Sequence, residues 1–295
     1  MSRTNEGEHM NTVDRALVLG PGGHAGTAWT AGLARGLRRE GVDLGEADLI
    51  VGTSAGAIVG ALLATGQDPG RLATVTRRPE HRITVDPART GAVFAVLGDR
   101  TAAPEESRRR VGRIALDSFG PEAEDVLLAS RAALVGADAW PERRLLITAV
   151  DAATGEPVVW DRDSEVPLVR AVAASSAFPG AAPPVTVDGR RYMDGALRSG
   201  PNADLAAGAR TLVVVDPLAH LFPPERLDRQ VAGGAAAVVV LSPDPASVAA
   251  FGADPGDSAA WEPSFRAGLR QAGEIDARLR SVWRAAADAG RADTA

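Results

Sequence analysis

A serine between two glycines is the residue best suited to chemistry in this sequence. It lies in Gly52-Thr53-Ser54-Ala55-Gly56, a G-x-S-x-G pattern. The apolar residues 49–51 predict a buried strand before it, and the Ala- and Leu-rich residues 57–63 predict a helix after it. A serine on so tight a turn is strained and exposes its hydroxyl, and side chains in place of the glycines would collide with the neighbouring strand or helix. The pattern predicts a nucleophile at Ser54, although patterns this short also occur by chance.

A glycine-rich turn earlier in the chain offers a place for an anion. It spans Gly20-Pro21-Gly22-Gly23-His24-Ala25-Gly26, between a predicted strand at 15–19 and a predicted helix at 27–39. Backbone N–H groups at the positive end of a helix bind anions. The turn is a loose dinucleotide fingerprint, or half of an oxyanion hole in which the N–H groups of Gly22, Gly23 and His24 face Ser54, or a plain turn.

The end of the second predicted strand favours the oxyanion hole. A dinucleotide site needs an acidic residue there to hold the ribose. This strand ends instead in Gly52-Thr53-Ser54. We expect the ring of His24 to be an ordinary solvated side chain.

Several aspartates follow predicted strands. Asp194-Gly195-Ala196 comes directly after a predicted hairpin at 185–193 that turns at Asp188-Gly189. By itself, Asp194-Gly195 fits a plain turn as well as a functional site. Three further aspartates at strand ends belong to no comparable motif, and we expect them to serve caps and turns: Asp151, Asp161 and Asp216.

The absent residue types narrow the chemistry. There is no cysteine, which excludes thiol nucleophiles, disulfides and Cys-based zinc sites. All 32 basic residues are arginine, which excludes Schiff-base chemistry and the Walker A lysine and points to a GC-rich bacterial genome. The 4 histidines are His9, His24, His81 and His220. Catalysis must therefore use hydroxyls, carboxylates, arginine or a single histidine.

The overall composition is that of a soluble globular protein. Hydrophobic residues make up 45% of the chain and charged residues 24%. A net charge of −6 argues against a nucleic-acid partner, because phosphate binding needs a basic face. No apolar run approaches the ~20 residues of a membrane span, and no secretory segment opens the chain. We expect a cytoplasmic protein.

Strands alternate with helices through most of the chain, which predicts a mainly parallel sheet covered on both faces. Further strands are expected at 144–150, 157–160, 211–215 and 237–241, and further helices at 69–78, 166–176 and 258–289. We expect residues 1–13 to form a disordered tail and residues 14–290 a single domain.

Residues 79–141 differ from the rest because they contain no strong strand. Their apolar residues are scattered in a way that fits a helical insertion with one apolar face: Val93, Phe94, Val96, Leu97, Val111, Ile114, Leu116 and Phe119. Such an insertion can be a lid over an apolar pocket or an ordinary packed helical layer.

Three motifs in this order resemble the patatin-like phospholipase family. Residues 21–26 are similar to its glycine-rich oxyanion motif, residues 52–56 to its nucleophile elbow, and Asp194-Gly195-Ala196 to its Asp-Gly-Gly/Ala motif. The stretch Ala174-Ser175-Ser176-Ala177-Phe178-Pro179 and the following Pro183-Pro184-Val185 resemble the family's approach to that aspartate. The likeness covers residues 15–290. It implies a three-layer α/β/α sandwich with a central, mostly parallel sheet.

The resemblance also implies roles for residues. Ser54 is the nucleophile, Asp194 is its general base without an intervening histidine, and the N–H groups of Gly22, Gly23 and Ala55 form the oxyanion hole. Partial burial would raise the pKa of such an aspartate into the working range of a base. The chain departs from the family at Ala25, where the oxyanion motif usually has arginine or lysine.

The implied activity is hydrolysis of a lipid or other carboxylic ester through an acyl-enzyme, as in a phospholipase A, lysophospholipase or esterase. An acyltransferase using the same Ser54 ester is the alternative, and a non-catalytic Rossmann-like binding module is a weaker one. The expected partner is a lipid or acyl-ester substrate, which allows transient contact with a membrane surface. The resemblance implies no metal and no organic cofactor.

Overall fold

The computed structural model describes residues 13–74, 83–120, 122–223, 225–232, 234–235, 237–254, 256–275 and 279–283. Its strands are β1 (Arg15–Leu19), β2 (Leu49–Gly52), β3 (Arg144–Asp151), β4 (Pro157–Trp160), β5 (Val185–Val187), β6 (Arg190–Asp194), β7 (Thr211–Val215) and β8 (Ala237–Leu241). Its α-helices are α1 (Gly23–Arg39), α2 (Ala55–Ala64), α3 (Pro87–Gly98), α4 (Pro104–Leu116), α5 (Glu122–Val135), α6 (Leu168–Ser175), α7 (Ala196–Ser199), α8 (Glu225–Val231), α9 (Pro245–Phe251) and α10 (Trp261–Ala272). Short 3-10 segments are η1 (Leu44–Glu46), η2 (Pro69–Leu72), η4 (Ala203–Ala206), η5 (Ala219–Leu221) and η6 (Ser258–Ala260).

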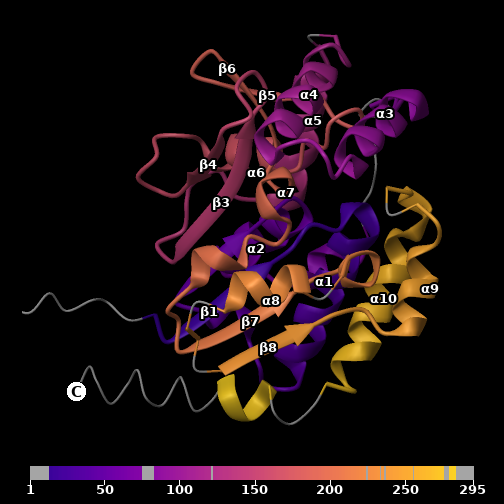
Figure 1. Ribbon diagram of the computed structural model, residues 1–295. Coiled ribbons are helices and arrows are strands. Elements are labelled where there is room, and N and C mark those ends of the chain that lie inside the picture. Colours follow the sequence, from indigo (N-terminus) through magenta and orange to yellow (C-terminus); the bar gives the residue numbers. More distant parts are fainter. Residues whose placement is uncertain are drawn as a thin grey trace, which may run out of the picture.

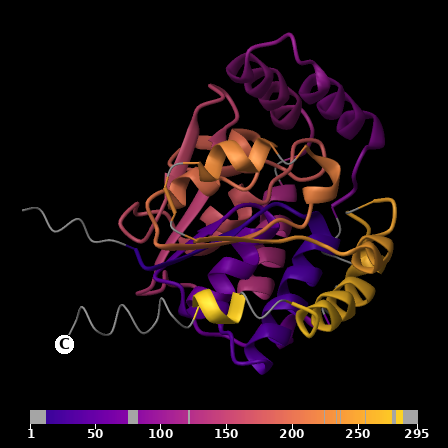
Figure 2. The ribbon, with the colours of Figure 1, turned by 60° about the horizontal axis from the view of Figure 1, so that its bottom comes forward.

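An 8-stranded sheet forms the centre of the molecule (Figure 1). Its pairing runs β5–β6–β3–β2–β1–β7–β8, with β4 also paired to β3. The pairs β1–β2, β1–β7, β2–β3 and β7–β8 are parallel, and the pairs β3–β4, β3–β6 and β5–β6 are antiparallel. Helices lie on both faces of this sheet (Figure 2). The predicted α/β/α fold with a mostly parallel sheet is confirmed.

The side chains of β1 show why the central strands are apolar throughout. Leu17 and Leu19 point into the larger core, shared with α1, α2, α5, α6 and α10. Ala16 and Val18 point into a second core on the opposite face, shared with η4 and α8. Because a parallel strand is buried on both faces, its sequence is a continuous apolar run rather than an alternating one.

Strand β3 brings two other strands end to end along one of its edges. Gly52 of β2 lies opposite Ile147, and Asp194 of β6 lies opposite Ala149. Ile147 and Ala149 also pair with β4, which occupies the other edge. Because β2 runs parallel to β3 and β6 runs antiparallel to it, the C-terminal ends of β2 and β6 meet beside Thr148.

The predicted helical insertion at 79–141 contains α3, α4 and α5. Val93 and Val96 of α3 form a cluster with Val111 and Ala115 of α4 and with Met193 of β6. Helix α5 packs against α2 and α6 and therefore belongs to the helical layer. Helices α3 and α4 lie at the periphery, as the purple pair in Figure 2 shows. A lid role for this segment stays a prediction.

Two predicted helices are shorter than expected. In place of a helix at 69–78 the chain forms η2, which ends at Leu72, and residues 75–78 lie outside the described residues. The Pro-Gly start of this segment disfavours a regular helix. The helix predicted at 258–289 is divided into η6, α10 and a helical segment at 279–283, with 276–278 and 284–289 outside the described residues. The predicted disordered tail lies outside them up to residue 12.

Candidate active site

The turn from β2 to α2 holds Ser54 in a strained conformation. Its φ is 56° and its ψ is −115°, in a region that residues with side chains avoid. A Cβ atom on Gly52 would lie 2.7 Å from Cα of Ala57, and one on Gly56 would lie 1.9 Å from the carbonyl oxygen of Leu19. The predicted strain and the predicted need for both glycines are confirmed.

The glycine-rich turn after β1 lies directly against this elbow. The N–H group of Gly56 donates to the carbonyl oxygen of Gly20 over 3.1 Å, which joins the two turns. Helix α1 begins at Gly23, four residues earlier than predicted, because the N–H group of Gly26 already donates to the carbonyl of Gly22. Half of the predicted loop is therefore the first turn of a helix.

Three backbone N–H groups in the two adjoining turns have no acceptor among the described residues. Those of Gly22, Gly23 and Ala55 donate no hydrogen bond to any group in the described part of the chain. They lie at the N-terminal ends of α1 and α2, where the helix dipole is positive. Groups of this kind stabilise an oxyanion or another small anion.

Asp194 is the hydrogen-bond partner of Ser54. The Oγ of Ser54 donates to Oδ2 of Asp194 over 2.7 Å, and Oδ1 accepts the N–H group of Ala196 over 2.8 Å. Asp194 is the last residue of β6, so the meeting of β2 and β6 beside β3 creates this contact. Ser54 is 8% exposed and Asp194 is 1% exposed. The pair has the geometry of an alcohol and its proton acceptor.

Burial raises the pKa of Asp194 to about 7. The hydrogen bonds from Ala196 and Ser54 act in the opposite direction, as does the positive charge of Arg131. A solvated aspartate is a weak base at neutral pH, whereas a carboxylate with a pKa near 7 is about half ionised there, and its ionised form accepts a proton more readily.

The end of α6 fixes the backbone of both residues. The N–H group of Ser54 donates to the Oγ of Ser175 over 3.0 Å. The N–H groups of Asp194 and Gly195 donate to the carbonyls of Ala177 and Ser175, over 3.0 Å and 3.2 Å. The sequence of this stretch resembles the family but does not predict these contacts.

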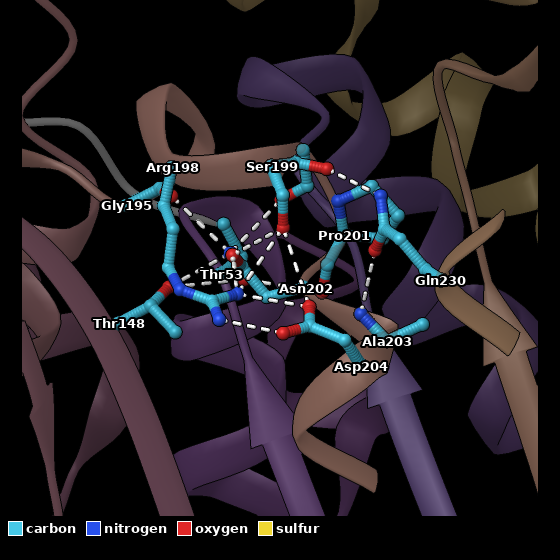
Figure 3. A network of polar contacts seen from close by, with 11 residues as sticks. Thr53, Thr148, Gly195, Arg198, Ser199, Pro201, Asn202, Ala203, Asp204 and Gln230 are labelled. Carbon is cyan, nitrogen blue, oxygen red and sulfur yellow. Dashed lines mark hydrogen bonds and ion pairs between the residues drawn. The ribbon is translucent and has the colours of Figure 1, made fainter. Parts of the chain in front are cut away.

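Asn202 lies at the centre of a buried polar network that no pattern in the sequence predicted (Figure 3). Its Nδ2 lies 2.9 Å from the Oγ1 of Thr53, 3.2 Å from the Oγ1 of Thr148 and 3.2 Å from the carbonyl oxygen of Gly195. One amide thus connects the residue before the serine, the residue after the aspartate and the strand between them. Asn202 is 0% exposed, with a φ of 60° that asparagine tolerates better than most residues.

The same network reaches the surface through α7. The Oδ1 of Asn202 accepts hydrogen bonds from Ser199 over 2.8 Å and from Arg198 over 2.9 Å. Arg198 also forms an ion pair with Asp204, with a distance of 2.5 Å between Nη2 and Oδ2. These contacts orient the amide, so that its nitrogen faces the site. A single asparagine after a Gly-Pro pair carries no local pattern that would have predicted this role.

The basic side chain near the site belongs to the insertion rather than to the glycine-rich turn. Ala25 is fully buried in the first turn of α1. Arg131 of α5 donates from Nε to the Oγ of Ser176 over 2.7 Å, and Ser176 lies between two of the residues that hold the pair. The turn itself is anchored by backbone hydrogen bonds and needs no basic side chain at position 25 for that purpose.

The described histidines lie apart from the Ser54 hydroxyl. The Nδ1 of His24 is 2.5 Å from the carbonyl oxygen of Gly256, and its ring is 6.3 Å from that of Trp261. His220 is exposed in η5. His9 and His81 lie outside the described residues.

The other singled-out aspartates serve turns, as predicted. Asp151 and Asp161 each accept backbone N–H groups of the turn that follows, and Asp151 also forms an ion pair with Arg190 at 2.8 Å. Asp216 accepts the N–H group of Leu218 at the end of β7, and burial raises its pKa. Within the described ranges, no group of three or more His, Asp or Glu side chains is arranged to hold a metal ion.

Comparison with known proteins agrees with the resemblance. A family model described as patatin-like phospholipase matches residues 17–207. The chain belongs to this family. The patatin-like segment contains both glycine turns, the helical insertion, Asp194 and Asn202.

Solved structures with a similar arrangement include VipD from Legionella pneumophila, at 12% identity and a TM-score of 0.41, with 88% of this chain and 67% of that chain covered. The type III effector ExoU has 18% identity and a TM-score of 0.39, with 88% and 53% covered. ExoU in its complex with SpcU from Pseudomonas aeruginosa has 20% identity and a TM-score of 0.38, with 92% and 52% covered. This patatin-like chain spans about half the length of the ExoU chains that it matches.

Proposed function

We propose that this protein is a serine acyl hydrolase that cleaves a carboxylic ester of a lipid through Ser54 and Asp194. The observation that carries the proposal is the 2.7 Å hydrogen bond from the strained Ser54 hydroxyl to a buried carboxylate. Burial raises the pKa of that carboxylate to about 7, which suits a general base at neutral pH. Membership of the patatin-like phospholipase family supports a lipid as the substrate.

In the first half-reaction the Oγ of Ser54 forms a bond to the ester carbonyl carbon while its proton moves to Oδ2 of Asp194. The negative charge that develops on the carbonyl oxygen is stabilised by the N–H groups of Gly22, Gly23 and Ala55. The tetrahedral intermediate then expels the alcohol, which takes the proton from Asp194. An acyl-Ser54 ester remains.

Water completes the cycle. It attacks the acyl carbon and transfers a proton to Asp194, and the same N–H groups stabilise the second oxyanion. Collapse releases the fatty acid, and the proton returns from Asp194 to Ser54. Neither His24 nor His220 takes part, which agrees with their positions in the described part of the chain.

The test is Ser54→Ala with Ser264→Ala as a matched control, because Ser264 is also a buried serine but lies in α10. Turnover of p-nitrophenyl butyrate should fall by at least ~10³-fold in the first variant and stay near the parent value in the second. A fluorophosphonate probe should label the parent and the control but not Ser54→Ala. A parent that takes no label, or a Ser54→Ala variant that retains turnover within about tenfold, would overturn the proposal.

A further inference from the structure

The second half of helix α3, from Gly91 to Gly98, has no polar side chain. Between Gly91 and Gly98 the exposed residues are Gly91, Ala92, Phe94, Ala95, Leu97 and Gly98. Phe94 is 60% exposed and Leu97 is 39% exposed. A helix on the surface of a soluble domain normally presents charged or polar residues to water, and a contiguous apolar patch usually marks a contact site.

Helix α10 shows the ordinary pattern in the same molecule. Its exposed residues are Glu262, Pro263, Arg266 and Arg270, three of which carry a charge. Both helices bury one side and expose the other. A position at the surface therefore does not by itself explain why the exposed residues 91–98 of α3 are apolar.

The opposite side of α3 packs next to the active site. Val93 and Val96 share a cluster with Met193, the residue before Asp194. The ring of Phe94 lies 5.5 Å from the ring of Phe178. Phe178 follows the residue whose carbonyl accepts the N–H group of Asp194. The apolar contacts of α3 therefore extend to Phe178, whose preceding residue is hydrogen-bonded to the backbone of Asp194.

Arginine residues stand at both ends of the apolar stretch. Arg89 precedes it and Arg100 follows it, and both are exposed. The Nη1 of Arg89 donates to the carbonyl oxygens of Asp117 and Ser118 after α4, and its Nε lies 3.6 Å from Asp86 in a solvent-exposed ion pair, which leaves Nη2 toward the solvent. An apolar strip bordered by arginines matches a phospholipid surface, where acyl chains lie beneath phosphate groups. None of the helices in the described part of the chain is long and apolar enough to cross a membrane.

We propose that the Gly91–Gly98 side of α3 inserts into the surface of a phospholipid aggregate and presents its lipids to the active site along Phe94 and Phe178. The inference rests on the proposed function, because it assumes a lipid ester as substrate. It adds the surface by which the enzyme meets that lipid. Arg89 and Arg100 contact the phosphates, and Phe94 and Leu97 enter the apolar layer.

The test compares the double variant Phe94→Ser, Leu97→Ser with Val240→Ser. Val240 is an apolar residue of β8 that is 45% exposed. Val240→Ser therefore also replaces an exposed apolar side chain by serine, but away from α3. Binding is measured by co-sedimentation with vesicles of phosphatidylcholine and phosphatidylglycerol, in a Ser54→Ala background that leaves the lipid intact. Turnover is measured in the active background on these vesicles and on soluble p-nitrophenyl butyrate.

The double variant should lose at least about tenfold in vesicle binding and in vesicle hydrolysis, because it removes the apolar groups that enter the lipid. Its turnover of the soluble ester should stay within about twofold of the parent, since neither residue touches Ser54. Val240→Ser should match the parent in every assay. Vesicles of phosphatidylcholine alone should bind the parent more weakly, because they carry no net charge for the arginines.

Three results would overturn the inference. The double variant could bind vesicles as the parent does, or Val240→Ser could lose binding equally. The third result is a parent that does not bind vesicles but forms a concentration-dependent dimer, together with a double variant that stays monomeric. This side of α3 would then be a contact between two copies of the chain. Each of these results leaves the proposed function intact if Ser54 still turns over the soluble ester, whereas loss of Ser54 labelling would remove the proposed function first.

Discussion

The two regions on either side of Phe178 are built in opposite ways. Toward the sheet, Asp194 and Asn202 are almost completely buried, and their polar atoms are engaged by hydrogen bonds. Away from it, α3 exposes Phe94 within a stretch, Gly91–Gly98, that has no polar side chain. Catalysis requires that the reacting groups are held in a fixed geometry, and many hydrogen bonds can provide this. Contact with a fluid lipid surface requires only exposed apolar area.

The contrast implies that the two regions can be separated experimentally. We call the residues where β2 and β6 end, among them Ser54, Asp194 and Asn202, the strand-end region. A change in this region should affect every substrate equally, whether it is soluble or part of a vesicle. A change on the exposed side of α3 should affect only the aggregated substrate. The ratio of the two activities therefore distinguishes the regions.

After Ser54→Ala itself, the largest effect should come from Asp194→Asn. The asparagine can keep hydrogen bonds to Ser54 and Ala196 but cannot accept the serine proton. We expect kcat to fall by at least ~10²-fold on soluble and vesicle substrates alike, so that their ratio is unchanged. In the parent, activity should fall with pH below a midpoint near 7, where Asp194 becomes protonated, and this dependence should disappear in the variant.

Thermal unfolding provides the folding control for Asp194→Asn. The folded pKa of Asp194 lies above its unfolded value, so ionisation destabilises the parent progressively as pH rises from about 4 to about 7. The uncharged asparagine avoids this cost, which is at most ~4 kcal/mol. The Tm of the variant relative to the parent should therefore increase over this range. If Asp194→Asn kept nearly the kcat of the parent while His24→Ala were inactive, the general base would instead be a histidine.

A smaller effect on the same region is expected for Asn202→Gly. Glycine tolerates the φ of 60° at this position but removes the amide that links Thr53, Thr148 and Gly195. The ends of β2 and β6 should then lose part of their alignment, with kcat falling about 10-fold and the ratio of soluble to vesicle activity unchanged.

Asp204→Asn is the matched control for Asn202→Gly, because it weakens the partly exposed end of the same network. It should leave kcat within about twofold of the parent, as expected for a partly exposed ion pair. Equal losses in the two variants would show that the network as a whole, rather than its buried amide, holds the site. An unchanged kcat in Asn202→Gly would show that β3 alone aligns the two strand ends.

The sequence predicted the parts of this site that depend on local structure. Gly52 and Gly56 are required within one turn, so a five-residue pattern reveals them, and the apolar runs of the buried strands identify the sheet. The meeting of Ser54 and Asp194 depends on the register of β2 and β6 against β3, which no local periodicity encodes. Only the resemblance to a family paired these two residues in advance.

Two further features escaped prediction for the same physical reason. Asn202 acts through residues that are distant in sequence, such as Thr53 and Thr148. The insertion was expected to have one apolar face, and both sides of α3 are apolar. Hydrophobic periodicity predicts which residues can be buried. It does not indicate which apolar side of a helix packs against the rest of the protein and which stays exposed.

The smallest effect should come from Arg131, which lies where the insertion meets the strand-end region. Its positive charge favours the ionised form of Asp194 and therefore lowers the pKa of that carboxyl. Arg131→Met keeps most of the aliphatic stem but removes the charge, so the acidic midpoint of the activity profile should move to higher pH. Activity at neutral pH should fall modestly, while activity well above the midpoint should approach that of the parent.

The charge-conserving variant decides between two explanations for that shift. Arg131→Lys keeps the cation but changes the hydrogen bond to Ser176, and its midpoint should stay close to that of the parent. Arg113→Met, which removes an exposed arginine from α4, should leave the profile unchanged. If Lys and Met shift the midpoint equally, the contact with Ser176 rather than the charge matters at position 131. Added salt should move the parent midpoint only slightly, because the attraction between a half-buried guanidinium and a buried carboxylate is weakly screened.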